Sequence, residues 1–250
     1  HMRLIRTIIP VLIFFMFIAC KDSQSVDSYS ESQKYPGIHQ ANSPIQLDGH
    51  GQELAWDEAI WYPLDHIWLG EKPTIEDFSG RFKLLWNSDN IYILAEITDD
   101  VILDLHENGL DRYWDDDCLE IFIDEDNSGG NHQYNHNAFA YHLAQNLRVT
   151  DMGLDSLPAY FDSHMQSAKV QEENLTTWEA GIKIFKDDYT FGASPRQLSI
   201  GDELGFMVAY CDNDTSEQRE NFIGSIAIEG EDKNRGWIDA GVFQDWTLIE

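Results

Sequence analysis

The feature that most constrains the fold is a series of short strand-like runs separated by turn residues. The runs RFKLLW (81–86) and IYILAEI (91–97) flank NSDN, a pattern that predicts a β-hairpin. Strand-like composition then recurs at 118–124, 137–143, 176–185, 204–211, 222–228 and 246–250. A helical turn is expected within 52–61, and no long helix. Many short strands without alternating helices predict an all-β fold, a single-domain antiparallel β-sandwich of jelly-roll type.

The run CLEIFID (118–124) shows the alternation of a strand with two different faces. Its apolar face is expected in the core and carries Leu119, Ile121 and Ile123. Its other face carries Cys118, Glu120 and Phe122.

Two Trp and two Cys lie within other strand-like runs. Trp86 and Trp178 are placed mid-strand and are expected in the core. Cys118 and Cys211 also lie in apolar runs, where a free cysteine behaves as a small hydrophobe. Two cysteines in a chain of this size do not form a disulfide scaffold, so both are expected to be unpaired.

The N-terminal residues predict export. Arg3 and Arg6 precede an apolar run (8–18) that is short for a transmembrane helix, which is the order of a signal peptide over 1–19. FIAC resembles a lipobox, so Cys20 is expected to be lipidated and to anchor the chain to a bacterial membrane, on the periplasmic face or the cell surface. The alternative is a cleaved signal with Cys20 present by chance.

A polar, Ser-rich segment follows the signal. Together with the lipidated Cys20, residues 20–43 are expected to form a flexible tether, and the folded domain is predicted to span 44–250.

The charge of the chain limits its partners. Removal of 1–19 takes away two of the 16 basic residues and none of the 45 acidic ones, which leaves 14 − 45 = −31. Such a surface repels nucleic acid and anionic membranes. Contact with a membrane is therefore expected only through the lipid anchor.

Two segments, 61–80 and 99–116, are too long for tight turns. Long loops on a rigid sheet commonly carry binding residues. The second of them leads directly to Trp114. Trp61 and Trp68, in the first, either line the same cleft or cover an end of the sandwich.

Three stretches, IQLDGHGQELAWDEA, FKLLWNSDNIYILAEITDD and WDDDCLEIFID, resemble in that order the first half of family 9 carbohydrate-binding modules. TTWEAGIKI, LGFMVAYCDND and GVFQDWTLIE are similar to its later strands. The resemblance covers about 44–250. It implies a non-catalytic β-sandwich that binds an oligo- or polysaccharide, commonly carries calcium, and works near glycan-degrading enzymes or transporters.

In this family a sugar ring lies between two Trp rings, while a Glu and an Asn hydrogen-bond its hydroxyls. The resemblance assigns these roles to Trp114, Trp237, Glu120 and Asn234. The arginines that help to bind sugar in the family have no clear match in this chain.

The spacing of Trp114 and Glu120 adds a condition. Six residues of extended strand would separate them by about 20 Å, at roughly 3.3 Å per residue. Binding of one sugar ring by both therefore requires the chain to bend at Asp115 and Asp116. Consecutive Asp residues disfavour a strand, which is consistent with such a bend.

The loop DEDNSGG is a candidate calcium site. Asp124, Asp126 and Ser128 have the alternate spacing with which calcium loops begin. An EF-hand is excluded, because Asn135 occupies the twelfth position and no helices flank the loop. The alternative is a solvated hairpin loop.

Two other functions use different residues. A small glycoside hydrolase would pair Glu120 with Asp116 or Asp99 across a cleft. A haem-binding sandwich domain would draw its ligands from Met152, Met165, Met207, His142 and His164. His132 and His136, four apart outside a helix, do not form an obvious metal pair.

Overall fold

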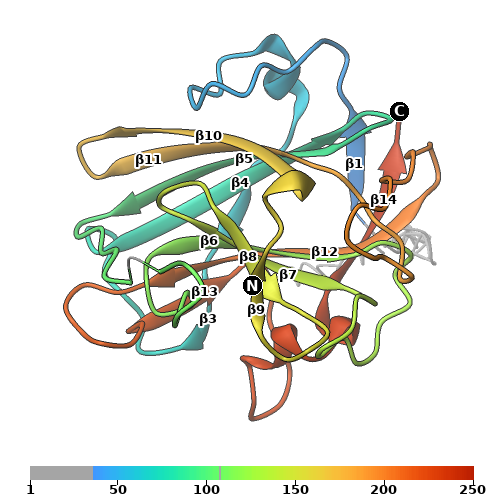
Figure 1. Cartoon of the computed structure of the whole chain (residues 1–250). Helices are drawn as coiled ribbons and strands as arrows, with labels where there is room; N and C mark the ends of the chain where they lie inside the picture. The colour runs from blue at the N-terminus through green and yellow to red at the C-terminus, as the bar shows by residue number, and fades with distance from the viewer. Residues whose placement is uncertain (1–35, 107) are drawn as a thin grey trace, which may run out of the picture. The chain divides into compact units, whose positions relative to one another are not determined.

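The computed structural model describes residues 36–106 and 108–250. The predicted signal peptide and Cys20 lie outside the described residues. Within them, fourteen strands belong to one mostly antiparallel sheet that folds back on itself into two layers (Figure 1). The all-β sandwich prediction is confirmed. No helix of the described residues is long and apolar enough to cross a membrane.

One layer is formed by two strand pairs, 78–99 and 165–182, with a short strand at 62–64. It contains β10 (Met165–Glu172), β11 (Leu175–Ile182), β5 (Ile91–Asp99), β4 (Phe78–Trp86) and β2 (Tyr62–Leu64). The other layer contains β12 (Glu203–Asp212), β6 (Cys118–Asp124), β7 (Phe139–Ala144), β8 (Val149–Met152), β9 (Pro158–Tyr160), β13 (Asn221–Gly224) and β3 (His66–Leu69). β1 (Gly37–Gln40) and β14 (Gln244–Ile249) pair in parallel and join the layers.

The predicted hairpin is present as β4 and β5, with nine residue pairs in antiparallel register. Asn87 organises its turn: the side-chain oxygen accepts the backbone N–H groups of Asp89 and Asn90, each at 2.9 Å. An Asn side chain that bonds the backbone two residues further on is the usual means of stabilising such a turn.

The main core lies between the layers and includes the predicted apolar face of β6: Leu119, Ile121 and Ile123. Trp86 and Trp178 belong to it too, as predicted. On its other face β6 contributes Cys118 and Phe122 to a second cluster under the covering loops. β6 is therefore buried along its whole length.

Three expectations about element boundaries need correction. β1 lies within the predicted tether, so ordered structure begins before residue 44. The segment 61–80 contains β2 and β3 and is not one long loop. β13 ends at Gly224, whereas the strand was expected to reach residue 228.

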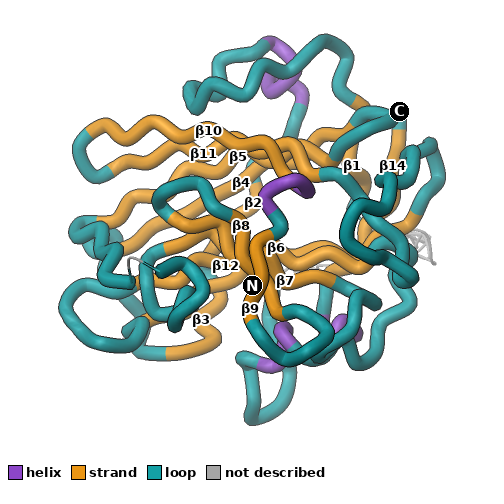
Figure 2. Tube along the Cα trace, in the orientation of Figure 1, coloured by secondary structure: helices purple, strands orange, loops and turns teal. Residues whose placement is uncertain are grey.

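The helical structure of the described residues is limited to four short 3₁₀ turns (Figure 2). η1 (Leu54–Glu58) falls where a helical turn was predicted. η2 (Asp162–His164), η3 (Arg235–Trp237) and η4 (Ala240–Val242) connect strands. Trp68 packs with Phe122 and Phe222 in the second core cluster, and Trp61 lies beneath the guanidinium of Arg81.

Candidate functional site

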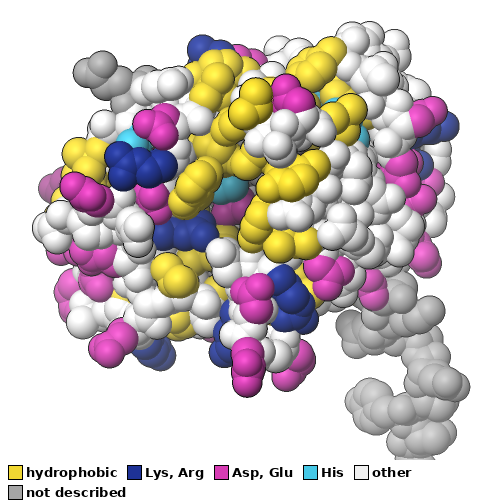
Figure 3. Space-filling view, turned by 60° about the horizontal axis from the view of Figure 1, so that its bottom comes forward, with side chains coloured by type: hydrophobic (Ala, Val, Ile, Leu, Met, Phe, Trp, Pro, Cys, Tyr) yellow, Lys and Arg dark blue, Asp and Glu magenta, His cyan; other side chains and the backbone are white. Residues whose placement is uncertain are grey.

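A cavity of about 370 Å³ opens on the layer that contains β6 and β7. This volume falls within the usual range for small-molecule sites. Figure 3 shows a hollow on this face, with hydrophobic side chains at its rim and charged and His side chains at its floor. The cavity is lined by Tyr113, Trp114, Glu120, Tyr134, His142, Met152, Arg219, Asn234 and Trp237.

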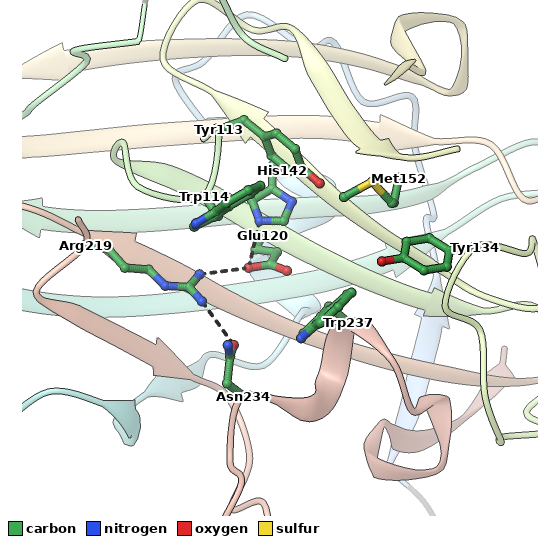
Figure 4. Close-up of a pocket in the computed structure, with 9 residues that line it drawn as sticks. All are labelled: Tyr113, Trp114, Glu120, Tyr134, His142, Met152, Arg219, Asn234 and Trp237. Atoms are coloured by element: carbon green, nitrogen blue, oxygen red, sulfur yellow. Dashed lines mark hydrogen bonds and ion pairs between the residues drawn. The ribbon is translucent and has the colours of Figure 1, made fainter. Parts of the chain in front are cut away.

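All four residues predicted to bind sugar line this one cavity: Trp114, Glu120, Asn234 and Trp237. Both indole side chains are partly exposed, at 36% each. In Figure 4 they lie on opposite sides of Glu120, whose carboxylate points between them. The structure thus brings together residues that are up to 123 positions apart in the sequence.

Trp114 reaches the cavity because the chain turns before β6 begins at Cys118. The N–H of Asp115 donates to the carbonyl of Arg112 at 2.8 Å, and Arg112 has a φ of 47°. Buried Tyr113 packs edge-on against Trp114, with ring centroids 5.0 Å apart. The segment is therefore bent, as the spacing of Trp114 and Glu120 required.

The carboxylates of the Asp triplet are buried and hold the loops around the cavity. Asp115 accepts the N–H of Arg219 at 3.3 Å. The other two accept backbone N–H groups at 2.5 to 2.9 Å: those of Leu105 and His106 for Asp116, and those of Leu103 and Asn213 for Asp117. Buried carboxylates are stabilised by such bonds. These three side chains therefore act as loop anchors.

The floor of the cavity is a charged group centred on Glu120, which is 2% exposed. Its Oε2 lies 3.2 Å from His142 Nε2 and 3.9 Å from Arg219 Nη1. Burial by itself raises the pKa of Glu120 and lowers that of His142. The charge of Glu120 outweighs burial at His142, whose pKa is raised to about 10. Because Arg219 also favours the carboxylate, we place the proton on His142.

Arg219 was missed by sequence reasoning. It lies between β12 and β13, and its Nη2 donates to Asn234 Oδ1 at 3.0 Å, so it links Asn234 to the Glu120 carboxylate (Figure 4). No local spacing connects it with Glu120. Only the strand pairing could have indicated it. The strands on either side of residues 213–220 pair with each other, and β12 pairs with β6, so these residues lie over the start of β6.

Four other lining residues were not assigned to sugar binding from the sequence: Tyr113, Tyr134, His142 and Met152. Tyr134 is 41% exposed and has a φ of 58°. A bulky residue rarely adopts that backbone conformation, and such outliers cluster at functional sites.

Trp237 is positioned by η3 and by a close approach at Gly236. A Cβ at Gly236 would lie 2.5 Å from the terminal methyl of Met207, so a larger residue would have to displace that flexible side chain. The Gly236 carbonyl is 2.7 Å from Nε2 of buried His132. Arg235 bonds the carbonyl of Asp232 at 2.8 Å and fixes the preceding loop.

The predicted calcium loop lies apart from the cavity. Asp124 accepts the N–H of Gly129 at 2.7 Å, and Asp126 accepts the N–H of Ser128 at 3.1 Å. These are the bonds of a tight polar turn. Calcium binding by Asp124, Asp126 and Ser128 stays a prediction.

The residues of the alternative functions are mostly elsewhere. Asp99 accepts the Tyr210 hydroxyl at 2.9 Å, and neither Asp99 nor Asp116 lines the cavity. Among the described residues, Glu120 is the one carboxylate in the lining. Of the haem candidates, His142 and Met152 line the cavity, whereas the others are buried away from it: Met165, Met207 and His164.

The family model described as "Carbohydrate family 9 binding domain-like" matches residues 47–250. The chain belongs to this family. No curated protein matches it. Membership of the family agrees with a non-catalytic, carbohydrate-binding domain.

Solved structures share the fold of this chain. A family 9 carbohydrate-binding module from Caldicellulosiruptor kristjanssonii in complex with cellotriose has a TM-score of 0.62 at 18% identity, covering 86% of this chain and 94% of its own. The complex with glucose gives 0.61 at 17%, covering 84% and 94%. A putative carbohydrate-binding protein from Bacteroides uniformis gives 0.57 at 11%, covering 86% and 99%.

Proposed function

We propose that this protein binds an oligo- or polysaccharide without cleaving it, and that one sugar ring occupies the cavity between Trp114 and Trp237. The observation that carries the proposal is that both indoles and Glu120 line one cavity of about 370 Å³. An indole face is complementary to the apolar C–H face of a pyranose ring. Family membership and the cellotriose and glucose complexes of similar structures support the same ligand class.

The polar floor supplies the directional contacts. Glu120 is held as a carboxylate by His142 and Arg219, so its free lone pairs accept hydrogen bonds from sugar hydroxyls. Asn234 is fixed by Arg219 and presents its side-chain amide to the same space. Because the ligand is held by two partly exposed rings and a few hydrogen bonds, we expect an affinity no tighter than about micromolar.

Calcium is part of the proposal, and a second group fits it better than the predicted loop does. Asp99, Asp117 and Asp212 are each at most 2% exposed, and one oxygen of each lies within 4.8 Å of the others. Asp212 Oδ1 is buried without a hydrogen-bond partner. Oxygen-only ligands of this kind suit Ca²⁺. These three residues would hold the ion and so join the ends of β5 and β12 to the start of β6.

The electrostatics of this group point the same way. Burial raises the pKa of Asp99 to about 6. Burial and the charge of Asp99 raise the pKa of Asp212 to about 7 and of Asp117 to about 9. Asp117 nevertheless accepts two backbone N–H groups, at 2.5 and 2.7 Å, which favours its ionised form. A divalent cation eases this conflict because it compensates two of the three carboxylate charges.

We propose that the predicted export signal directs the domain out of the cytoplasm. We propose that lipidated Cys20 anchors it to a membrane and that the following segment holds it near glycan-degrading enzymes or transporters. In a bacterial host the wild-type chain should be recovered in the membrane fraction, whereas Cys20→Ala should be recovered largely outside it. Equal distribution of the two would contradict the anchor and leave sugar binding unaffected.

The direct test is a calorimetric titration of the full chain with short β-glucan, xylan and galactan oligosaccharides, in calcium and in EDTA. Binding of at least one class, lost in Trp114→Ala, would support the proposal and identify the sugar. A folded chain that binds none of them would refute the proposal.

A further inference from the structure

Next to the floor of the cavity lie two buried cysteines that sugar binding does not use, beside His142 of the floor itself. Cys118 on β6 and Cys211 on β12 are opposite each other in the register of these strands. Both are unpaired and buried, and neither lines the cavity. His142, on β7, completes the group. One ligand atom from each of the three lies within 4.8 Å of the others.

This composition and spacing suit a tetrahedral metal. Zinc binds thiolate sulfur at about 2.3 Å and imidazole nitrogen at about 2.0 Å, so its ligand atoms lie roughly 3.5 to 4 Å apart. Because the observed spacing is at most 4.8 Å, metal binding requires these atoms to approach one another by about 1 Å or less. Glu120 lies beside two members of this group: its Oε2 is 3.2 Å from His142 Nε2 and 3.7 Å from Cys211 Sγ.

The orientation of His142 provides an independent observation. Its Nδ1 lies 3.1 Å from the carbonyl oxygen of Ala140, so this nitrogen carries a proton and donates it. Metal-binding histidines characteristically donate their second ring N–H to a carbonyl or carboxylate, which directs the other nitrogen toward the metal. In this structure Nε2 is the nitrogen directed toward Glu120.

The charge balance of the metal-bound site fits a divalent cation. With both thiols ionised, Cys118, Cys211 and Glu120 carry three negative charges, and Arg219 supplies one positive charge at 3.1 Å from Cys211 Sγ. The remaining charge of two would be costly in a buried site. A divalent metal reduces it to zero, while Arg219 stays as a hydrogen-bond donor to the Cys211 thiolate.

We propose that Cys118, Cys211 and His142, with Glu120 as the fourth ligand, bind a divalent transition metal of the zinc type. The metal takes the places of the protons on the two thiols and on His142 Nε2, and these protons are released to solvent. The site lies on three strands of one layer, so it would fasten the floor of the cavity and fix the Glu120 carboxylate. Iron, copper and cobalt share parts of this ligand preference; the sulfur and nitrogen set with one carboxylate favours zinc.

The test uses the reduced full chain, freed of transition metal by a chelator and returned to calcium-containing buffer. It is titrated under nitrogen with Co²⁺ and then with Zn²⁺. We expect one equivalent of Co²⁺ to give a thiolate-to-cobalt charge-transfer band and the visible bands of a tetrahedral site, and Zn²⁺ to displace it. Cys211→Ser should weaken metal binding by more than about 100-fold, since even outer-shell changes cost 10 to 100-fold.

The controls separate ligation from folding. His50→Ala removes an exposed histidine and should leave the cobalt spectrum unchanged. Cys118→Ser replaces Cys211→Ser if the latter does not fold. Three results would overturn the proposal: no charge-transfer band from the folded, reduced wild-type chain, a band that survives loss of either thiol, or a Cys118–Cys211 disulfide in protein isolated from its own compartment.

Discussion

Replacement of Trp114 by Ala tests the sugar site most directly. The side chain is 36% exposed, and a Trp side chain has about 250 Å² of surface, so about 90 Å² is available to a ligand. At about 25 cal/mol per Å², complete covering of that area contributes at most about 2 kcal/mol. This corresponds to about a 30-fold loss of affinity in Trp114→Ala. For a ligand of micromolar affinity or weaker, the loss brings binding close to the limit of calorimetric detection.

The partial exposure of Trp114 also sets an expectation for stability. The covered part of Trp114 packs against Tyr113, so Trp114→Ala should also lower the melting temperature by a few degrees. Trp61→Ala is the matched control, because Trp61 is likewise partly buried but lies beneath Arg81, outside the cavity. It should reduce stability to a similar extent without changing affinity. The reasoning is refuted if Trp114→Ala unfolds the protein, or if both variants bind sugar like the wild type.

Arg219→Met should weaken sugar binding by about 10-fold or more, because the substitution frees Asn234 and removes a charged partner of Glu120. Titration calorimetry measures the affinity, and an unchanged value would contradict the role of Arg219. Calcium at 100 times its Kd should raise the melting temperature by about 5 to 10 °C, and Asp212→Asn should abolish this gain, whereas Asp188→Asn at an exposed position should keep it. In EDTA, stability should fall between pH 4 and pH 8, because the folded-state pKa values of Asp99 and Asp212 are raised to about 6 and 7 and the folded state therefore binds more protons than the unfolded state. Added calcium should remove most of this fall, as measured by thermal unfolding. An identical pH profile with and without calcium would exclude the site.

The strand pattern was predictable because it depends on local composition. The alternation in 118–124 identified the core face of β6, and NSDN identified the β4–β5 turn. The residue boundaries were less accurate where pairing partners are distant. β1 is a strand only because Gly37 to Gln40 lie between β14 and β4, and nothing in their polar sequence indicates that pairing.

The functional site, like the fold, was predictable only in part from the sequence. Trp114, Glu120, Asn234 and Trp237 were found through resemblance to a family, and the structure places them around one cavity. The charged partners of Glu120 could not be found in this way. His142 reaches it across the β6–β7 register, and Arg219 reaches it from a loop 99 residues further along the chain.

The short segment from Tyr113 to Glu120 therefore connects every part of the proposed mechanism. Its aromatic residues form one wall of the cavity, its Asp side chains hold the loops that carry Leu103 and Asn213, and Glu120 forms the floor. Because Asp117 belongs to the proposed calcium group and also anchors these loops, loss of calcium should loosen the position of Trp114 as well as the fold. Sugar affinity should then fall in EDTA even at temperatures where the chain stays folded. If calcium changes only the melting temperature, the Asp group stabilises the sandwich independently of the cavity.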